Sequence, residues 1–215
     1  MTIATSAWLD RFFDFYYARH PVSATFIGVH RQDYVLPDYS ADGVTTTIAQ
    51  ARELLDMVDT GQVEQPENEW ESIDRLLARN FLIIRIWELS DHRVHLRNPC
   101  VYTGEAIFGF ISLFLRDYAP LDERVASATV RMRSIPELLD QGLANIDTAP
   151  QAWIERAINE CTGAIALLTE GVDILMERYG VLSADFTLQI LFLQYCKWRL
   201  ENSLTCNLPD KPRKI

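Results

Sequence analysis

Hydrophobic residues recur at steps of three and four along most of the chain, the spacing that places them on one face of an α-helix. The clearest series comprises Ile154, Ile158, Cys161, Ile165, Leu168, Val172, Leu175 and Tyr179. Such a stripe needs neighbouring helices to cover it, and Gly163 and Gly171 favour close packing within one bundle over a free coiled coil. No stretch alternates like a half-buried strand. The pattern predicts an all-α fold, an irregular bundle of about seven to nine helices without a sheet.

Residues that commonly begin or end helices divide this pattern into segments. A first helix containing Trp8 and Phe12 is expected to end near His20-Pro21, and a later one at Gly61. Asn68 and Glu71 have the spacing of a capping box, which predicts the start of a long helix that Asn98-Pro99 ends. Further helices are expected over Thr103 to Asp117, over Leu121 to Arg133, after a second capping box at Ser134 and Glu137, and from Ser183 through Trp198.

We interpret residues 1–203 as a single helical domain. Residues 204–215 are polar and interrupted by prolines, which is typical of a flexible tail. The net charge of −10 argues against partners that are nucleic acids or anionic membranes. The most apolar stretch, Ala106 to Leu115, is about half as long as a bilayer requires. No secretory signal is visible at the N-terminus, and the four cysteines are widely spaced, so we expect a cytoplasmic protein with reduced thiols.

Two histidines near the end of the long predicted helix are weak candidates for a metal site. The spacing of His92 and His95 would place both imidazoles on one helix face, with Glu88 one turn before them. Their order differs from the H-E-x-x-H arrangement of zinc peptidases. The favoured interpretation is a solvated helix end at which histidine interacts with the negative end of the dipole. We therefore predict no metal site in this chain.

Glu105 is the carboxylate that the sequence singles out, because it lies at the start of a strongly apolar helix, close to Tyr102. It could lie at the rim of a cleft beside the Tyr102 hydroxyl, or it could stabilise the helix N-terminus while Tyr102 packs. The residues alone favour the second role. The sequence contains no G-x-S-x-G, S-x-x-K or phosphate-binding glycine loop, and thus no self-contained active site.

Several short segments, taken in order, resemble a known family. They are Phe12-Phe13-Asp14-Phe15-Tyr16, His20-Pro21-Val22-Ser23-Ala24-Thr25, Gly28-Val29-His30, Leu36-Pro37-Asp38-Tyr39-Ser40, Arg97-Asn98-Pro99, Tyr102-Thr103-Gly104-Glu105-Ala106, Leu115-Arg116-Asp117-Tyr118-Ala119-Pro120 and Ile135-Pro136-Glu137-Leu138-Leu139. Together they resemble the N-terminal half of the bacterial domain-of-unknown-function family 885, whose members are regarded as candidate zinc-dependent peptidases of the gluzincin type. The likeness covers roughly Trp8 to Tyr179.

This resemblance implies a helical region that forms one wall of a substrate cleft, with Tyr102, Gly104 and Glu105 facing the cleft. The zinc signature of the family, H-E-T-Y-P-G-H followed by a later glutamate, belongs to a half that this chain lacks. Zinc is therefore expected only in that half, and this chain is expected to be inactive alone. The implied partners are a peptide substrate or a complementary catalytic half. The alternative is a stand-alone helical interaction or ligand-binding module that binds a partner or itself through exposed apolar surface, over residues 154–179 or 106–115.

Overall fold

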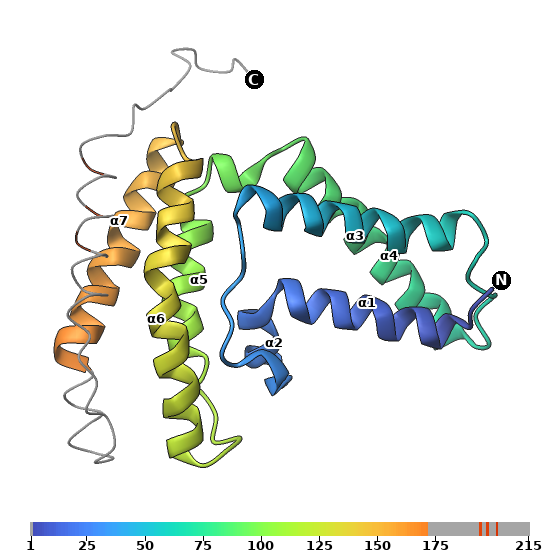
Figure 1. The fold of residues 1–215 in the computed structure, drawn as a ribbon, viewed down its shortest axis with the longest axis horizontal. Coiled ribbons are helices and arrows are strands. Elements are labelled where there is room, and N and C mark those ends of the chain that lie inside the picture. The colour runs from blue at the N-terminus through green and yellow to red at the C-terminus, as the bar shows by residue number, and fades with distance from the viewer. Residues whose placement is uncertain (1, 172–193, 195–196, 198–200, 202–215) are drawn as a thin grey trace, which may run out of the picture. The chain divides into compact units, whose positions relative to one another are not determined.

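The computed structural model describes residues 2–171 together with 194, 197 and 201. These residues form seven α-helices (Figure 1): α1 (Thr5–Arg19), α2 (Pro21–Ile27), α3 (Ala41–Asp59), α4 (Glu69–Ser90), α5 (Cys100–Ile111), α6 (Leu121–Asn145) and α7 (Gln151–Ala166). Short 3₁₀ turns at His30–Gln32 and Val94–Leu96 and a π-helical turn at Leu167–Gly171 complete them. The all-α fold without a sheet is confirmed for this part of the chain. The helix expected from Ser183 and the end of the hydrophobic series, 172–179, lie outside the described residues.

The chain divides into two compact units. Unit 1 comprises Met1–Gln32 and Pro37–Val94, and unit 2 comprises Asp33–Leu36 and His95–Ile215. Helices α1 to α4 belong to unit 1, and α5 to α7 belong to unit 2. The single domain over 1–203 and the tail over 204–215 stay predictions.

The core of unit 1 forms where the aromatic face of α1 packs between α3 and α4. Trp8 and Phe12 of α1, Leu54 of α3 and Leu82 of α4 are all buried. The indole Nε1 of Trp8 donates to the Leu54 carbonyl at 3.0 Å, so its one polar atom is satisfied inside the core. The helix that the sequence predicts around Trp8 and Phe12 is thereby confirmed.

The N-terminal segment is attached to the loop between α3 and α4. The Ile3 amide donates to the Gln62 carbonyl at 2.9 Å, and the Glu64 amide donates to the Ile3 carbonyl at 2.8 Å. These bonds form an isolated parallel bridge between Ile3 and Val63. The Thr5 hydroxyl, at the start of α1, adds a bond of 2.7 Å to the Glu64 carbonyl. Ile3 and Thr5 are therefore part of the packed structure of unit 1.

The start of α4 is the helix boundary that the sequence predicts most closely. The Asn68 side chain accepts a hydrogen bond from the Glu71 amide at 2.9 Å, as an N-cap does. The Glu71 carboxylate accepts from the Glu67 amide at 2.9 Å, one residue before the position expected for a capping box. The Gly61 boundary is also close, because α3 ends at Asp59 and Gly61 has a φ of 74°.

Two boundaries in the middle of the chain differ from the prediction. Helix α4 ends at Ser90 rather than at Asn98-Pro99, because the Asp91 and His92 amides both bond to the Trp87 carbonyl and Arg93 has a φ of 51°. Helix α5 begins at Cys100 rather than at Thr103, and ends at Ile111 rather than at Asp117. The Asn98 side chain accepts from the Cys100 amide at 3.0 Å, so Asn98 and not Thr103 stabilises this N-terminus.

The predicted break at Ser134 is wrong, since α6 continues through Pro136 to Asn145. The Ser134 hydroxyl bonds back to the Val130 carbonyl at 3.4 Å and does not cap a new helix. A proline inside a helix removes one backbone hydrogen bond. Burial of Ile135 and Leu138 on either side of Pro136 offsets that loss.

Helix α7 buries a face that is rotated slightly from the predicted stripe. Ile154 and Cys161 are buried as expected, but Ala157 and Ala164 share the buried face, while Ile158 and Ile165 are half-buried. The close approach expected at Gly163 is not found, because a Cβ added there would meet nothing within 4 Å. Alanines, rather than this glycine, lie at the close contacts of α7.

Candidate functional site

Tyr102, the first candidate for the cleft, lies in the core of unit 2. Its side chain is 2% exposed, and its hydroxyl donates to the His95 carbonyl at 2.7 Å and accepts from the Asn145 Nδ2 at 2.9 Å. Its ring lies against Gly142 of α6, where an added Cβ would lie 2.7 Å from the ring carbon Cγ. Tyr102 therefore joins α5 to α6.

Gly104 and Glu105 lie next to this anchor and are half-buried, whereas Thr103 and Ala106 on either side of them are buried. A Cβ added to Gly104 would meet nothing within 4 Å, so the backbone is approachable there. Of the three sequence candidates, Gly104 and Glu105 are thus the two that reach the surface of unit 2.

The buried guanidinium of Arg131 lies behind this surface and organises the polar interior of unit 2. Arg131 is 1% exposed. Its Nε donates to the Val35 carbonyl at 3.0 Å, and its Nη1 donates to the Gly109 carbonyl at 2.9 Å. A longer contact of 3.4 Å reaches the Ser112 hydroxyl. Arg131 therefore ties the segment Asp33–Leu36 to both α5 and α6.

Acidic groups surround Arg131 and compensate its charge. Burial lowers the pKa of Arg131 to about 10, and the negative charges of Asp33 and Glu105 oppose that shift. The Tyr118 hydroxyl donates to the Asp33 carboxylate at 2.7 Å. Burial and this hydrogen bond raise the pKa of Tyr118 well above its usual value, so the phenol stays protonated. Glu105 therefore belongs to a charge network and is not an isolated carboxylate at a helix start.

A second arginine fixes the loop that carries Tyr118. Arg124 is buried, and its Nε donates to the Ala119 carbonyl at 3.0 Å, while its Nη2 contacts the Asp117 carboxylate at 2.7 Å. Of the segments that carry the family resemblance, 115–120 is thus held by Arg124, and Glu105 of 102–106 interacts with the charge of Arg131. The sequence analysis missed Arg131 and Asp33. A signal was present for Arg131, since Ala128, Met132 and Ile135 mark that side of α6 as buried.

This arrangement is suited to binding. Glu105 is a partly exposed carboxylate in the field of a buried guanidinium, and an anionic oxygen in that position accepts hydrogen bonds from amide or ammonium groups of a ligand. Gly104 beside it is half-buried and has no side chain, which allows an extended chain to approach its backbone closely.

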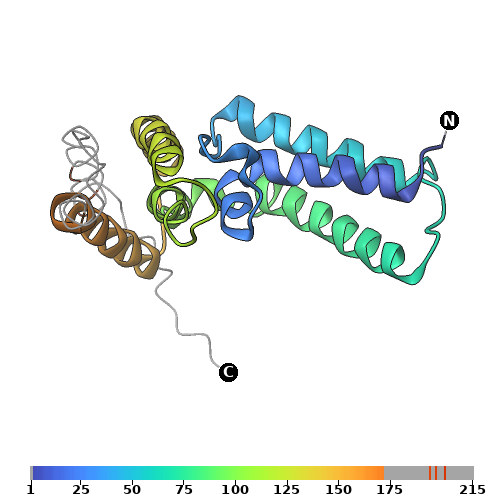
Figure 2. The same cartoon turned by 90° about the horizontal axis from the view of Figure 1, so that it is seen from below.

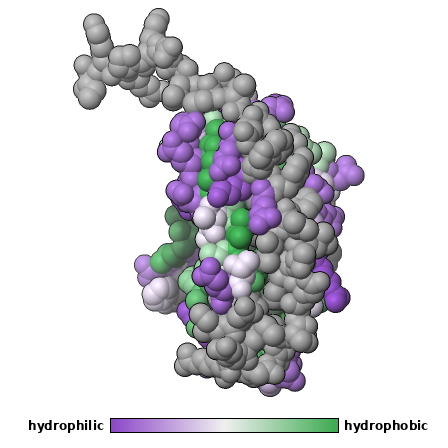
Figure 3. All heavy atoms as spheres, turned by 90° about the vertical axis from the view of Figure 1, so that its left-hand side faces the viewer, coloured by the Kyte–Doolittle hydropathy of each residue, from purple (hydrophilic) through white to green (hydrophobic). Residues whose placement is uncertain are grey.

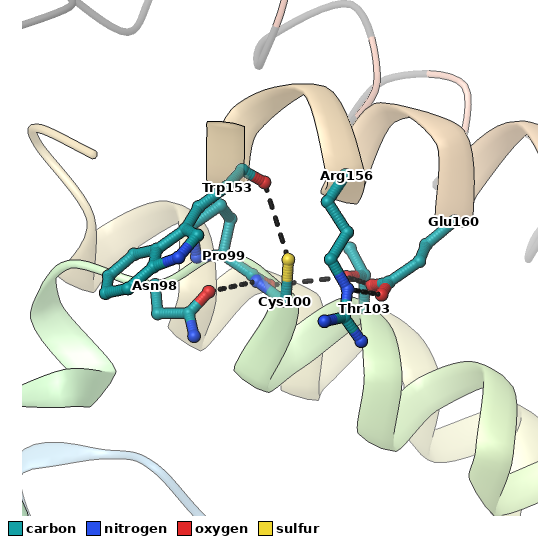
Figure 4. Close-up of polar contacts among 7 residues, drawn as sticks. All are labelled: Asn98, Pro99, Cys100, Thr103, Trp153, Arg156 and Glu160. Carbon is teal, nitrogen blue, oxygen red and sulfur yellow. Dashed lines mark hydrogen bonds and ion pairs between the residues drawn. The ribbon is translucent and has the colours of Figure 1, made fainter. Parts of the chain in front are cut away.

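A second polar cluster joins α5 to α7 (Figure 4). The Thr103 hydroxyl donates to the Glu160 carboxylate, whose other oxygen pairs with the Arg156 guanidinium at 2.8 Å. The Cys100 thiol donates to the Trp153 carbonyl at 3.4 Å. Burial and the nearby charge of Glu160 raise the pKa of Cys100 to about 11, which is the opposite of what an activated nucleophile requires. We interpret this cluster as a structural contact between the two helices.

Cys100 should consequently react slowly with iodoacetamide at neutral pH. With a thiol pKa of about 11, the thiolate fraction at pH 8 is about 100-fold smaller than with a pKa of 9, and the rate follows that fraction. Mass-spectrometric mapping of Cys100 alkylation between pH 7 and pH 11 should show a rate that still rises above pH 10. Glu160→Gln removes one cause of the shift and should move this rise to lower pH; a plateau below pH 9 in the unchanged chain would contradict the assignment.

The three weak metal candidates do not share a helix face, because α4 ends before both histidines. Glu88 pairs with Arg85 at 3.4 Å. The His92 ring stacks on Trp87 with 4.9 Å between ring centroids, and His95 lies buried in the 3₁₀ turn that follows. Within the part of the chain that the structure describes, no three His, Cys, Asp or Glu side chains are grouped so that they could hold a metal ion.

Unit 1 contains a half-buried histidine, His20, which the sequence analysis names only at a helix boundary and in a resemblance segment. The His20 ring packs against Tyr16 and Phe81, with centroid distances of 5.1 and 5.7 Å. Burial and the nearby charge of Arg85 lower the pKa of His20 to about 3. His20 is therefore neutral at physiological pH and acts as a packing residue.

The two apolar stretches proposed for the alternative function, 154–179 and 106–115, are largely buried within unit 2 where the structure describes them. In residues 154–171 the buried members of the series are Ile154, Cys161 and Leu168, and in the apolar stretch Ala106, Phe110 and Leu113 are buried. Figure 3 shows one face of the molecule, on which hydrophobic side chains lie as separate groups among hydrophilic ones. A small apolar pocket, lined by residues that include Ala106, Phe110 and Met132, encloses about 10 Å³, the space of a single water molecule.

The fold and site define an all-α protein with a buried arginine network. The chain matches the profile of the bacterial proteins of unknown function called DUF885 over residues 21–187, and it belongs to that family. A solved structure from Shewanella oneidensis, described as "a putative lipoprotein of unknown function", resembles it with a TM-score of 0.71 at 20% sequence identity. This level of identity shows a shared fold alone.

That match covers 94% of this chain and 36% of the other, so this chain spans about a third of the length of its structural relative. None of the curated proteins compared with the chain matches it. None of the described helices is both long and apolar enough to cross a bilayer.

Proposed function

We propose that this chain is the N-terminal helical part of a zinc-metallopeptidase-like protein, that it forms one wall of the substrate cleft, and that it does not catalyse hydrolysis by itself. The observation that carries the proposal is the surface at Gly104 and Glu105, held in place by Tyr102 on one side and backed by Arg131. The half-buried glycine backbone and the partly exposed carboxylate together suit a bound peptide, whose amide and ammonium groups are hydrogen-bond donors.

Membership of family 885 and the match to one part of a longer structural relative support the proposal. The sequence has no H-E-x-x-H, which is the arrangement that supplies two zinc ligands and the general base in gluzincins. A complementary polypeptide that carries this motif would supply the metal and the catalysis. The residues of this chain would then bind and orient the peptide.

The proposal is tested with the 215-residue chain and a pool of peptides that carry a photo-activated cross-linker. We expect cross-links to concentrate at residues 104–105, and Glu105→Gln to lower their yield about tenfold, since a charge-assisted hydrogen bond contributes about 1.5 kcal/mol. Glu137→Gln is the matched control, because Glu137 is an exposed carboxylate on α6. Equal losses in both variants, or cross-links elsewhere only, would count against the cleft wall.

The absence of catalysis is tested separately with internally quenched peptides and one equivalent of Zn²⁺. The expected rate is that of buffer. Stoichiometric zinc together with turnover that stops on chelation would overturn this part of the proposal.

A second candidate function is a stand-alone interaction module. The observation that favours it lies in unit 1, where α4 exposes an apolar face.

A further inference from the structure

Helix α4 carries a row of large hydrophobic side chains that the core of unit 1 does not use. The row, named here the α4 row, consists of Trp70, Ile73, Leu76, Leu77, Ile83, Ile84 and Trp87. Each is at least 39% exposed, and Trp70 is 76% exposed. Trp87 also contacts His92, which leaves half of the indole accessible.

The opposite face of the same helix makes the core contacts. Ala78, Leu82, Arg85 and Leu89 are buried there. Figure 2 shows α4 along one edge of unit 1, with α1 and α3 on one side of it. Because α4 packs into unit 1 through this other face, the α4 row does not contribute to the core of unit 1.

The spacing of the row is that of a helix made to pack against another long helix. Trp70, Ile73, Leu77, Ile84 and Trp87 occupy the a and d positions of consecutive heptads, and Asn80 takes the remaining d position. Leu76 and Ile83 widen the stripe on one side. Full burial of the row would remove roughly 800 Å² from each copy, which is the area per partner of a standard protein–protein interface. Exposed patches of single soluble proteins are usually smaller.

The order of the residues points to a second copy of the same helix as the partner. Read in either direction along the helix, the a and d positions begin Trp-Ile and end Ile-Trp, with Leu77 and Asn80 at the centre. An antiparallel pair about a two-fold axis therefore places Trp70 opposite the partner's Trp87 and Ile73 opposite the partner's Ile84. Such a surface is self-complementary, as a two-fold interface requires.

Charge favours the antiparallel over the parallel arrangement. The first turns of α4 and the residue before its cap are acidic, with Glu67, Glu69, Glu71 and Asp74 exposed or half-buried. A parallel pair would bring two such ends together, and like charges oppose association. The antiparallel pair separates them and also opposes the two helix dipoles.

We propose that the α4 row is a homodimer interface, in which two copies of α4 pack antiparallel about a two-fold axis between residues 78 and 79. Each Asn80 lies near this axis, opposite the partner's Leu77. The proposal does not depend on the cleft function proposed for unit 2.

The first test measures the mass of the 215-residue chain by light scattering across a range of about 1–100 µM. The unchanged chain is expected to give the mass of two chains at the upper end. Leu77→Glu, at the centre of the row, should give a monomer at every concentration. Ile27→Glu is the matched control, because Ile27 is similarly exposed but lies on α2. A monomeric unchanged chain, or equal dissociation in both variants, overturns the proposal.

The second test determines the direction of the helices by disulfide cross-linking in a background whose native cysteines are alanine and whose helical circular dichroism is unchanged. Ile73→Cys and Ile84→Cys proteins should cross-link when mixed and not when oxidised separately. In the antiparallel pair, two copies of position 73 are about 16 Å apart along the axis, beyond the reach of a disulfide. Cross-linking of either variant with itself, or no cross-linking in the mixture, overturns the antiparallel interface.

Discussion

Replacing Arg131 with methionine should lower the free energy of unfolding by about 3–5 kcal/mol, because removal of one member of a buried charge network leaves the others unpaired. The Val35 and Gly109 carbonyls lose their guanidinium donors, and Asp33 and Glu105 lose the compensating charge. Urea denaturation followed by circular dichroism measures the change.

The control for this experiment is Arg133→Met, two residues along the same helix and exposed. It should change stability by less than about 0.5 kcal/mol, as surface substitutions do. Arg131→Lys keeps the charge but cannot make the forked contacts. Its free energy of unfolding should therefore lie between those of Arg131→Met and Arg133→Met. A loss below about 1 kcal/mol in Arg131→Met would mean that the network contributes little to the fold of unit 2.

Gly142→Ala should destabilise the protein by about 2 kcal/mol, although alanine is the better helix former. The new methyl group would lie 2.7 Å from the Tyr102 ring, and the ring is held by hydrogen bonds from its hydroxyl to the His95 carbonyl and from Asn145. A ring fixed at both ends has little freedom to move aside, so the strain of overpacking outweighs the helix preference.

Gly163→Ala, on α7, is expected to have the opposite effect on stability. The methyl group enters open space on an exposed face of α7, and only the preference of alanine for the helix remains. We expect stabilisation of about 0.5–1 kcal/mol. Thermal denaturation of the two variants in parallel should give midpoints that move in opposite directions. A shift in the same direction would show that the Tyr102 ring adapts to the added group.

Local signals predicted the helices well where the interactions that define them are local. The Asn68 side chain caps α4 through the amide three residues later, and the aromatic spacing of α1 follows from the face that it buries. Other boundaries depend on distant residues. Arg124 holds the turn that follows α5, and burial beside Pro136 keeps α6 continuous. These effects could not be read from the local sequence.

The candidate site was predicted only in part, because its geometry also depends on residues that are distant in the sequence. The sequence selected the correct segment at 102–106 but not the inward direction of Tyr102, which depends on Asn145, forty-three residues away. Arg131 reaches Val35 across an even longer separation in the sequence. A charged residue within an amphipathic pattern is normally placed at the surface, so the buried position of Arg131 could be expected only from the apolar residues on its side of α6.

The bridge between Ile3 and Val63 joins the segment before α1 to the connection between α3 and α4. The few residues before α1 and the connection from α3 to α4 hold each other, so neither can separate without releasing the other. A protease that cuts one of them would weaken the grip on the other, and both would become susceptible together. The segment before α1 is of a kind that can often be removed without effect, but here it supplies half of the contact that stabilises the connection from α3 to α4.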